Sequence, residues 1–247
     1  MILLGDIGNT DTKIFLIDNN KKIKKKIILS TSKINNTLLK KNFSFIINKK
    51  LLIKKSLFSS VVPKKFLLIK SFVLNNLKSK CMELKNLKLG KIMKIDVNKK
   101  QIGSDRLANA ISAIDNKNNF IIIDFGTATN FDIVIKNQYI GGILAPGVQL
   151  SLNNLIDKAS LIPKIKLEKI NNVIGKNTNS AIRSGFYHGY TGLIDNILKL
   201  IIKQTGKSYK IILTGGLAYL FKDSIKGKKI IKRDLTINGI LKVAINS

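Results

Sequence analysis

Apolar runs that end in glycine and small polar residues occur at two places nearly half the chain apart. They read Ile2-Leu3-Leu4-Gly5-Asp6-Ile7-Gly8-Asn9-Thr10 and Ile121-Ile122-Ile123-Asp124-Phe125-Gly126-Thr127-Ala128-Thr129. In each copy an aspartate ends the run, a glycine follows two residues later, and a second apolar run comes next. This pattern predicts two hairpins whose turns are open to a ligand, because glycine lets the backbone come close. The repeat predicts two similar domains, at residues 1–117 and 118–247.

The remaining hydrophobic pattern predicts strands first and then alternating strands and helices in each half. In the first half we expect strands at 12–18, 27–29, 56–62 and 92–96, and helices at 37–50, 64–78 and from Gly103 onward. In the second half we expect strands at 120–124, 131–135, 139–143 and from 211, and helices at 148–157, 179–203 and 234–245. This succession is typical of an α/β fold with mixed sheets. Because no low-complexity segment separates the halves, we expect a hinged cleft between them.

Composition restricts the class of protein. A chain of 247 residues with 45% hydrophobic content can bury two cores, which excludes a disordered protein. No apolar run approaches the roughly 20 residues that span a bilayer, so no membrane partner is expected. The start of the chain lacks a basic region ahead of its apolar stretch, and the single cysteine, Cys81, permits no internal disulfide. These features predict a soluble cytoplasmic protein in which Cys81 is inert.

The formal net charge of +30 at first suggests a nucleic-acid partner. However, only Arg106, Arg183 and Arg233 among the 44 basic residues are arginines, and the lysines are scattered along the whole chain. Surfaces that read bases or clamp phosphates favour arginine. Abundant lysine, asparagine and isoleucine with little alanine fit codon drift in an AT-rich genome. We therefore expect no specific nucleic-acid partner, only salt-sensitive adhesion to polyanions.

The two turns predict a phosphate-binding site. The sequence has neither a Gly-x-x-x-x-Gly-Lys-Ser/Thr loop nor a Gly-x-Gly-x-x-Gly after a strand. Asp6 is placed to hold Mg²⁺ through water, residues 8–10 to wrap the β- and γ-phosphates of a nucleotide, and Thr127 to close over them. Thr214-Gly215-Gly216 would admit a flat adenine ring. The alternatives are ordinary hairpin turns and a plain strand-to-helix turn, and the repetition after two buried strands favours the nucleotide.

A second candidate site is Gly103-Ser104-Asp105-Arg106, at a predicted helix start where backbone N–H groups and the helix dipole favour anions. A carboxylate there can act as a general base and an arginine can bind an anion. The alternative is a helix-terminal acid beside a surface arginine. The only histidine, His188, is predicted to have a packing role, and without a His/Cys cluster no structural zinc is expected.

These motifs stand in the order seen in one family. They are Asp6-x-Gly-Asn-Thr10, Ser59-Ser-Val-Val-Pro63, Gly103-x-Asp-Arg106, Asp124-x-Gly-Thr-Ala-Thr129, Gly142-x-x-Ala-Pro-Gly147, Gly175-Lys-Asn-Thr178 and Thr214-Gly-Gly-Leu-Ala218. The chain resembles the type III pantothenate kinases from end to end. The resemblance implies two actin-like (ribonuclease H-like) domains with an interdomain cleft, and ATP-dependent phosphorylation of pantothenate to 4′-phosphopantothenate, the first step of coenzyme A biosynthesis.

The resemblance also implies roles for individual residues and a homodimer. The ATP-binding set comprises Asp6, Ile7, Gly8, Asn9, Thr10, Asp11, Thr12, Lys13 and Thr127, and the pantothenate-binding set comprises Gly103, Ser104, Asp105, Arg106 and Thr178. Asp105 resembles the catalytic base, and Asp124 is similar to the residue that binds a monovalent cation, K⁺ or NH₄⁺. The implied cofactors are ATP, Mg²⁺ and that cation. Thr178 fits a helix N-cap equally well, and its helix forms the dimer interface in the family.

One departure from the family pattern concerns the pantothenate pocket. The family commonly has a tyrosine seven residues before the first glycine of Gly-x-Asp-Arg, followed by Asn-Pro, whereas Asp96, Asn98 and Lys99 stand here. An aspartate cannot replace the apolar face of a tyrosine that packs against substrate. Either a neighbouring residue substitutes for the tyrosine, or Asp96 lines a weakened or altered pocket. Asn130, where threonine is usual, is a smaller change. The alternative function is that of a non-catalytic relative acting as a regulatory or accessory factor.

Overall fold

The computed structural model of the protein describes residues 1–246, which fall into two compact units. Unit 1 comprises Met1–Ala113, Asn137–Tyr139 and the chain from Asp234 onward, and unit 2 comprises Ile114–Lys136 and Ile140–Arg233. The chain first passes from unit 1 to unit 2 close to the expected boundary between residues 117 and 118, which stays a prediction. The C-terminal segment is grouped with unit 1 rather than with the second half of the sequence.

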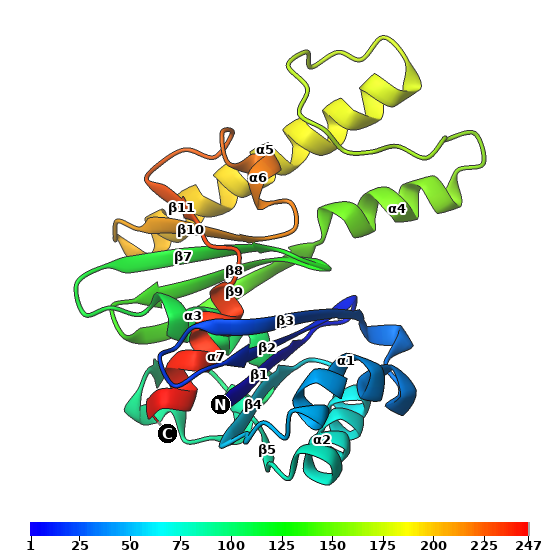
Figure 1. The fold of residues 1–247 in the computed structure, drawn as a ribbon. Coiled ribbons are helices and arrows are strands. Elements are labelled where there is room, and N and C mark those ends of the chain that lie inside the picture. Colours follow the sequence, from blue (N-terminus) through cyan, green and yellow to red (C-terminus); the bar gives the residue numbers. More distant parts are fainter. Residues whose placement is uncertain (247) are drawn as a thin grey trace. The chain divides into compact units, whose positions relative to one another are not determined.

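Unit 1 is built on a five-stranded sheet in the order β3-β2-β1-β4-β5 (Figure 1). Its elements are β1 (Ile2–Ile7), β2 (Asp11–Ile17), β3 (Ile23–Ser30), α1 (Asn36–Asn48), β4 (Lys55–Ser60), α2 (Pro63–Leu77), β5 (Cys81–Glu83), β6 (Lys94–Ile95), α3 (Ser104–Ala113) and α7 (Leu235–Asn246). Strand β2 is antiparallel to β1 and β3, whereas β4 is parallel to β1 and β5. Because parallel strands end at the same edge, the carboxyl ends of β1 and β4 lie side by side.

Alternating side chains give the sheet of unit 1 two apolar faces. Leu3 and Phe58 belong to the core shared with Phe43 of α1 and Phe72 of α2. On the other face, α3 and α7 pack against β4, and α7 also packs against β1. Helix α2 begins at Pro63, where the lost N–H costs nothing because the first turn of a helix leaves its N–H groups unpaired. Unit 1 therefore holds a sheet between two helical layers.

Unit 2 repeats the topology of unit 1. Its elements are β7 (Asn119–Phe125), β8 (Ala128–Ile135), β9 (Gln138–Pro146), α4 (Val148–Lys158), α5 (Thr178–Thr205), β10 (Lys210–Gly215), α6 (Ala218–Phe221) and β11 (Lys229–Ile231), except that the first two residues of β9 are grouped with unit 1. The second sheet has the order β11-β10-β7-β8-β9-β6, with β7 antiparallel to β8 and parallel to β10. Read from β9 to β11, this order matches β3-β2-β1-β4-β5. The α/β fold with two similar mixed sheets, predicted from the repeated turn, is confirmed.

The structure differs from the sequence-based elements mainly at short edge strands. Strands β5 and β11 have three residues each and were not predicted, and the strand expected at 92–96 is reduced to Lys94–Ile95. Strands this short carry too few alternating positions to give a periodic signal. Among residues 1–246, no helix is long and apolar enough to cross a membrane.

Candidate functional site

The β1–β2 turn of unit 1 is held in shape by Thr31, a residue that the sequence analysis did not single out. The Gly8 N–H donates to Asp11 O at 3.0 Å and closes the turn. The Thr31 hydroxyl donates to Gly8 O at 2.7 Å, and the Thr31 N–H donates to Thr10 O at 2.8 Å. The hydroxyls of Thr31 and Thr12 share a buried hydrogen bond of 2.9 Å. Hydrogen bonds from Thr31 therefore hold the turn in shape, while Asn9 and Thr10 at its tip are exposed to solvent.

The predicted ATP-binding residues of unit 1 all lie along this hairpin. Asp6 and Ile7 end β1, Gly8, Asn9 and Thr10 form the turn, and Asp11, Thr12 and Lys13 begin β2. Asp6 is half-buried and pairs with Ser59 of β4, while Thr12 is fully buried. The turn residues and Asp11 are the ones open to a ligand, whereas Thr12 has a structural role.

The Gly103 tetrapeptide lies at the same edge of the sheet as this turn. The Val61 N–H donates to Ile7 O at 3.0 Å, which carries the chain after β4 past the end of β1. A Cβ atom on Gly103 would lie 3.7 Å from Val61 Cγ1, so the start of α3 is next to this segment. The structure therefore brings the Asp6 and Asp105 motifs to one edge of unit 1, as expected where parallel strands end.

Asp105 lies in the first turn of α3, with its carboxylate folded back over the helix start. Its Oδ1 accepts the Arg106 N–H at 2.8 Å, and a Cβ atom on Gly103 would collide with that oxygen. A larger residue at 103 would therefore displace the carboxylate from this position. Burial raises the pKa of Asp105, and the Arg106 N–H and guanidinium partly oppose the rise. A raised pKa makes the ionised carboxylate a stronger base.

Two buried polar atoms near the start of α3, the Ser104 hydroxyl oxygen and Oε1 of Glu83, have no hydrogen-bond partner within the described part of the chain. The Ser104 side chain lies close enough to the Glu83 carboxylate to lower the pKa of that group. Burial also raises the pKa of Glu83, against smaller opposing effects from Ser104 and nearby N–H groups. Because buried polar atoms are normally paired, the unpaired Ser104 oxygen fits a position where substrate or water binds.

Asp96, at the position of the missing tyrosine, is an exposed surface residue. Its N–H donates to Tyr139 O at 3.0 Å, and its carboxylate accepts the Gln138 side-chain amide and lies 3.6 Å from Lys94 Nζ. The Asp96 side chain therefore provides no apolar face. The aromatic residue in this region is Tyr139, whose hydroxyl accepts a hydrogen bond from Arg106 Nη2 at 3.0 Å. Sequence reasoning missed Tyr139.

In unit 2, the turn after Asp124 is packed tightly against the start of α4. Gly147 caps α4, and a Cβ atom there would collide with Thr127 O and lie 2.6 Å from its carbonyl carbon. The Gly126 N–H donates to Ala128 O at 3.1 Å across the turn. Thr127 is exposed and Asp124 is half-buried. The Ala-Pro-Gly147 motif therefore supports the turn from one side.

The Thr214-Gly-Gly motif supports the same turn from the neighbouring strand. Gly215 has φ +87°, and a Cβ atom on it would lie 2.5 Å from Phe125 O. The Gly216 N–H donates to Phe125 O at 3.1 Å, and Thr214 pairs with Asp124. Three separate motifs therefore meet at the end of β7, and backbone contacts that exclude side chains hold them together.

Thr178 is the first residue of α5, and it is not the helix N-cap. Asn177 caps the helix by accepting the Ser180 N–H at 2.9 Å, while the Ser180 hydroxyl lies 3.1 Å from the Asn177 N–H. Thr178 is exposed. The capping role that the sequence allowed for Thr178 is thus filled by its neighbour, and its ligand role stays a prediction.

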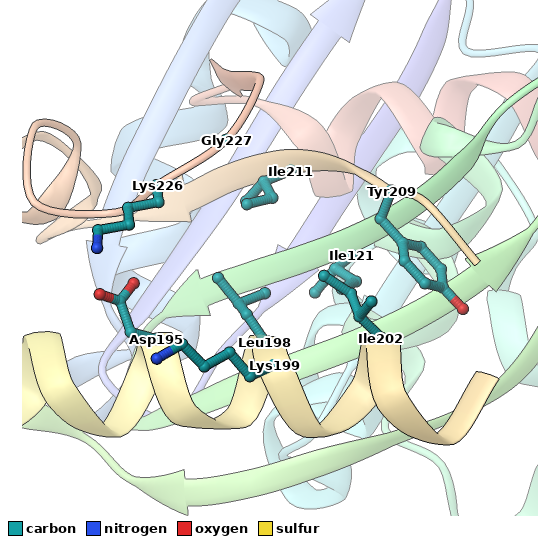
Figure 2. A pocket seen from close by; sticks show the side chains of 9 residues that line it. All are labelled: Ile121, Asp195, Leu198, Lys199, Ile202, Tyr209, Ile211, Lys226 and Gly227. Atoms are coloured by element: carbon teal, nitrogen blue, oxygen red, sulfur yellow. The ribbon is translucent and has the colours of Figure 1, made fainter. Parts of the chain in front are cut away.

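Two cavities in unit 2 contain none of the predicted site residues. The first, of about 220 Å³, lies between α5 and strands β7 and β10 (Figure 2). Its walls include Ile121, Ile211 and Leu198, and Asp195 and Lys226 lie at one end. The second, of about 460 Å³, is a groove between α4 and α5 lined by apolar residues and glycines.

The repeated sheet, with a glycine turn after the first strand of each copy, defines the fold class of actin-like ATPases and sugar kinases. A Sinorhizobium meliloti structure assigned as a 2-dehydro-3-deoxygalactonokinase matches with a TM-score of 0.63 and 8% identity, covering 100% of this chain and 98% of that chain. A Campylobacter jejuni structure assigned to the Baf family of transcriptional activators matches with a TM-score of 0.60 and 19% identity, covering 100% of both chains. At these identities the likeness shows the fold alone.

The sequence comparisons are more specific. A sequence model of the type III pantothenate kinase family matches residues 2–200. The type III pantothenate kinase of Pelagibacter ubique is 59% identical over 242 residues, which cover 98% of each chain. The protein therefore belongs to the type III pantothenate kinase family.

Proposed function

We propose that the protein transfers the γ-phosphoryl group of ATP to the 4′-hydroxyl of pantothenate, giving 4′-phosphopantothenate for coenzyme A synthesis. Family membership supports the reaction. The observation that carries it in the structure is the half-buried Asp105 carboxylate, whose pKa is raised by burial, at the same sheet edge as the β1–β2 turn. Such a transfer needs a turn whose backbone binds the phosphates and a base that accepts the proton of the alcohol.

In this proposal each residue of the Asp105 motif has one task. Asp105 accepts the proton of the 4′-hydroxyl as its oxygen attacks the γ-phosphorus. Gly103 and Ser104 contact pantothenate, and Arg106 binds its negative charge. The backbone N–H groups of the turn after Asp6, together with Thr127, bind the nucleotide phosphates. Thr178 contributes a further contact to pantothenate.

Two cations belong to the proposal. Asp6 would hold Mg²⁺ through water, and the ion would neutralise charge on the β- and γ-phosphates. Asp124 would bind K⁺ or NH₄⁺, because oxygen donors such as its half-buried carboxylate and nearby backbone carbonyls suit a hard cation. No group of three or more His, Cys, Asp or Glu side chains gathers within residues 1–246, which fits ions held mainly by phosphate, water and carbonyl oxygens.

The reaction and its cation dependence can be tested together. Purified protein with ATP, Mg²⁺ and pantothenate is expected to form 4′-phosphopantothenate with K⁺ or NH₄⁺ present, and less when Na⁺ replaces them. Mass spectrometry of the product is the measurement. Asp124→Asn should remove the cation dependence, while the matched variant Asp157→Asn, at an exposed position of α4, should keep it. A folded protein that yields no product under any cation would overturn the proposed function.

The proposal includes a cytoplasmic homodimer that uses α5. The 460 Å³ groove between α4 and α5 is lined by Leu155, Phe186 and Leu193, and by Gly185 and Gly189 on α5. Cβ atoms on these two glycines would meet nothing within 4 Å. Each glycine inside a helix costs about 1 kcal/mol relative to alanine, and the described chain offers no packing reason for them. Close approach of a second copy supplies such a reason.

Gly189→Arg is expected to convert the dimer to a monomer, because the long cationic side chain would fill the apolar groove. The substitution should not harm α5 itself, since arginine is a good helix former, whereas glycine is less favourable than alanine by roughly 0.8–1 kcal/mol. Light scattering coupled to size-exclusion chromatography measures the mass. Gln204→Arg adds the same charge at an exposed position of α5 outside the groove and should remain dimeric. A Gly189→Arg protein that stays dimeric would exclude this face as the interface.

The second candidate function is that of a non-catalytic regulatory relative. The single observation behind it is Asp96, which stands where the family commonly has the pocket tyrosine. The intact Asp105 motif and the braced β1–β2 turn favour the enzyme. The two functions are separated by the Asp105 variant described in the Discussion.

A further inference from the structure

Tyr139 is a buried tyrosine whose hydroxyl contacts a candidate substrate-binding residue. The tyrosine is 1% exposed, and its hydroxyl accepts a hydrogen bond from Arg106 Nη2 at 3.0 Å. It belongs to the three-residue segment Asn137–Tyr139, which is part of unit 1 although the chain on either side belongs to unit 2. A residue distant in sequence is thus built into the surroundings of the Asp105 motif.

The position of Tyr139 is fixed by the pairing of β6 with the start of β9. The Lys94 N–H donates to Asn137 O and the Asp96 N–H donates to Tyr139 O, both at 3.0 Å. The Gln138 side-chain amide adds a bond to the Asp96 carboxylate. Backbone bonds on both sides of Gln138 leave Tyr139 little freedom to move. Its phenol is therefore a fixed acceptor for Arg106.

A fixed acceptor matters because arginine is a flexible side chain. Ordering a long cationic side chain costs up to about 2 kcal/mol in rotamer freedom, and a free enzyme that has already ordered it binds an anion more tightly. The guanidinium is planar, so a hydrogen bond at one nitrogen also orients the others. Because Tyr139 is buried, it has no surface of its own to offer to substrate.

We propose that Tyr139 is a positioning residue for Arg106, which it holds in the orientation that binds the carboxylate of pantothenate. This inference rests on the proposed function. It also explains how the chain works without the family tyrosine at position 96: Tyr139 stands in the same region and acts through Arg106 rather than by touching substrate.

The test is Tyr139→Phe, which removes one oxygen and keeps the buried ring. We expect the KM for pantothenate to rise roughly tenfold, with kcat and the KM for ATP within about twofold. The reason is that the variant weakens binding of the pantothenate carboxylate and leaves the chemical step unchanged. Discrimination against the pantothenate analogue with an alcohol in place of the carboxylate should fall by a similar factor. Tyr209→Phe is the matched control. It also removes one tyrosine hydroxyl, which hydrogen-bonds to Thr205 in unit 2, and it should change none of these values.

A double-mutant cycle separates positioning from general loss of structure. If Tyr139 acts through Arg106, Tyr139→Phe should have no further effect on the KM in an Arg106→Gln background. Additive effects, an unchanged KM, or equal loss for the acid and its alcohol analogue would each overturn the inference. Failure of the proposed function would look different, since the wild-type protein itself would then form no product. Calorimetric titration with pantothenate would in that case compare binding by the wild type and Tyr139→Phe directly.

Discussion

Asp105→Asn is expected to lower kcat by about 10²- to 10⁴-fold, the usual contribution of a positioned general base. Asparagine keeps the size of the side chain but cannot accept the proton of the 4′-hydroxyl. The change leaves the β1–β2 turn untouched, so ATP should bind with unchanged affinity. Steady-state kinetics and a fluorescent-nucleotide titration are the two measurements. Activity within tenfold of wild type would mean that Asp105 is not the base, and an unaltered cellular role without turnover would favour the regulatory relative.

The same variant should be more stable than the wild type at neutral pH. Burial raises the pKa of Asp105 in the folded protein above the ordinary value of about 3.9. A raised folded pKa means that the protonated carboxyl stabilises the fold fully below pH about 4, and that this stability is lost as pH rises through the folded pKa. Asparagine carries no charge at any pH. The Tm of Asp105→Asn should therefore exceed that of wild type at pH 7, and the difference should shrink toward pH 4.

Asp115 provides a control because its pKa is shifted in the opposite direction from that of Asp105. Hydrogen bonds from Asn118 and the Lys117 N–H lower its pKa, so its stabilising effect is present at neutral pH and is lost on acidification. Asp115→Asn should lower the Tm at pH 7 without affecting turnover. If Asp105→Asn lowered the Tm at pH 7, as Asp115→Asn is expected to do, the assignment of Asp105 as a destabilised base with a raised pKa would be wrong.

The sequence predicts those parts of the site that are built from one continuous segment. The two aspartate turns and the start of α3 each carry glycine, apolar strand and helix signals within a few residues, and the structure brings the Asp6 and Asp105 motifs to one sheet edge. Thr31 and Tyr139 have no such local signal, because their importance comes from contacts across 23 and 33 residues of sequence. Sequence reasoning could have noticed the Ser30-Thr31-Ser32 run after β3 as a source of hydroxyls. No local pattern in the sequence indicates that Tyr139 contacts Arg106.

The packing of helix α7 also could not be predicted from local sequence. Helix α7 was predicted almost to the residue, since its apolar spacing is strong, yet the sequence assigned it to the second domain. Its place in unit 1 depends on packing against α3, more than 100 residues away in the chain. Local periodicity decides that a helix forms, whereas the shapes of two helix surfaces decide where it packs.

Gly239→Ala is accordingly expected to destabilise the protein, although alanine favours a helix more than glycine by about 1 kcal/mol. Gly239 is buried in α7, where a Cβ atom would collide with Ala108 O and lie 2.6 Å from the carbonyl carbon of Ala108. Overpacking of this kind costs about 1–3 kcal/mol, with a value at the upper end expected because backbone cannot rotate away. A net loss of about 2 kcal/mol should lower the Tm by roughly 4–8 °C in calorimetry. Gly90→Ala, where the methyl group meets nothing within 4 Å, should change it little.

A second substitution tests whether backbone atoms or side-chain atoms of α3 cause the collision. The atoms that a methyl group at 239 would meet are the carbonyl oxygen, carbonyl carbon and Cα of Ala108, so shortening that side chain creates no space. Ala108→Gly should therefore fail to rescue Gly239→Ala, and should add the cost of a glycine within α3. Rescue would instead mean that side chains set the helix spacing. Because α3 carries Asp105 and Arg106 at its start, separation of the two helices should also lower kcat/KM for pantothenate, and this loss should follow the loss of Tm across substitutions at position 239.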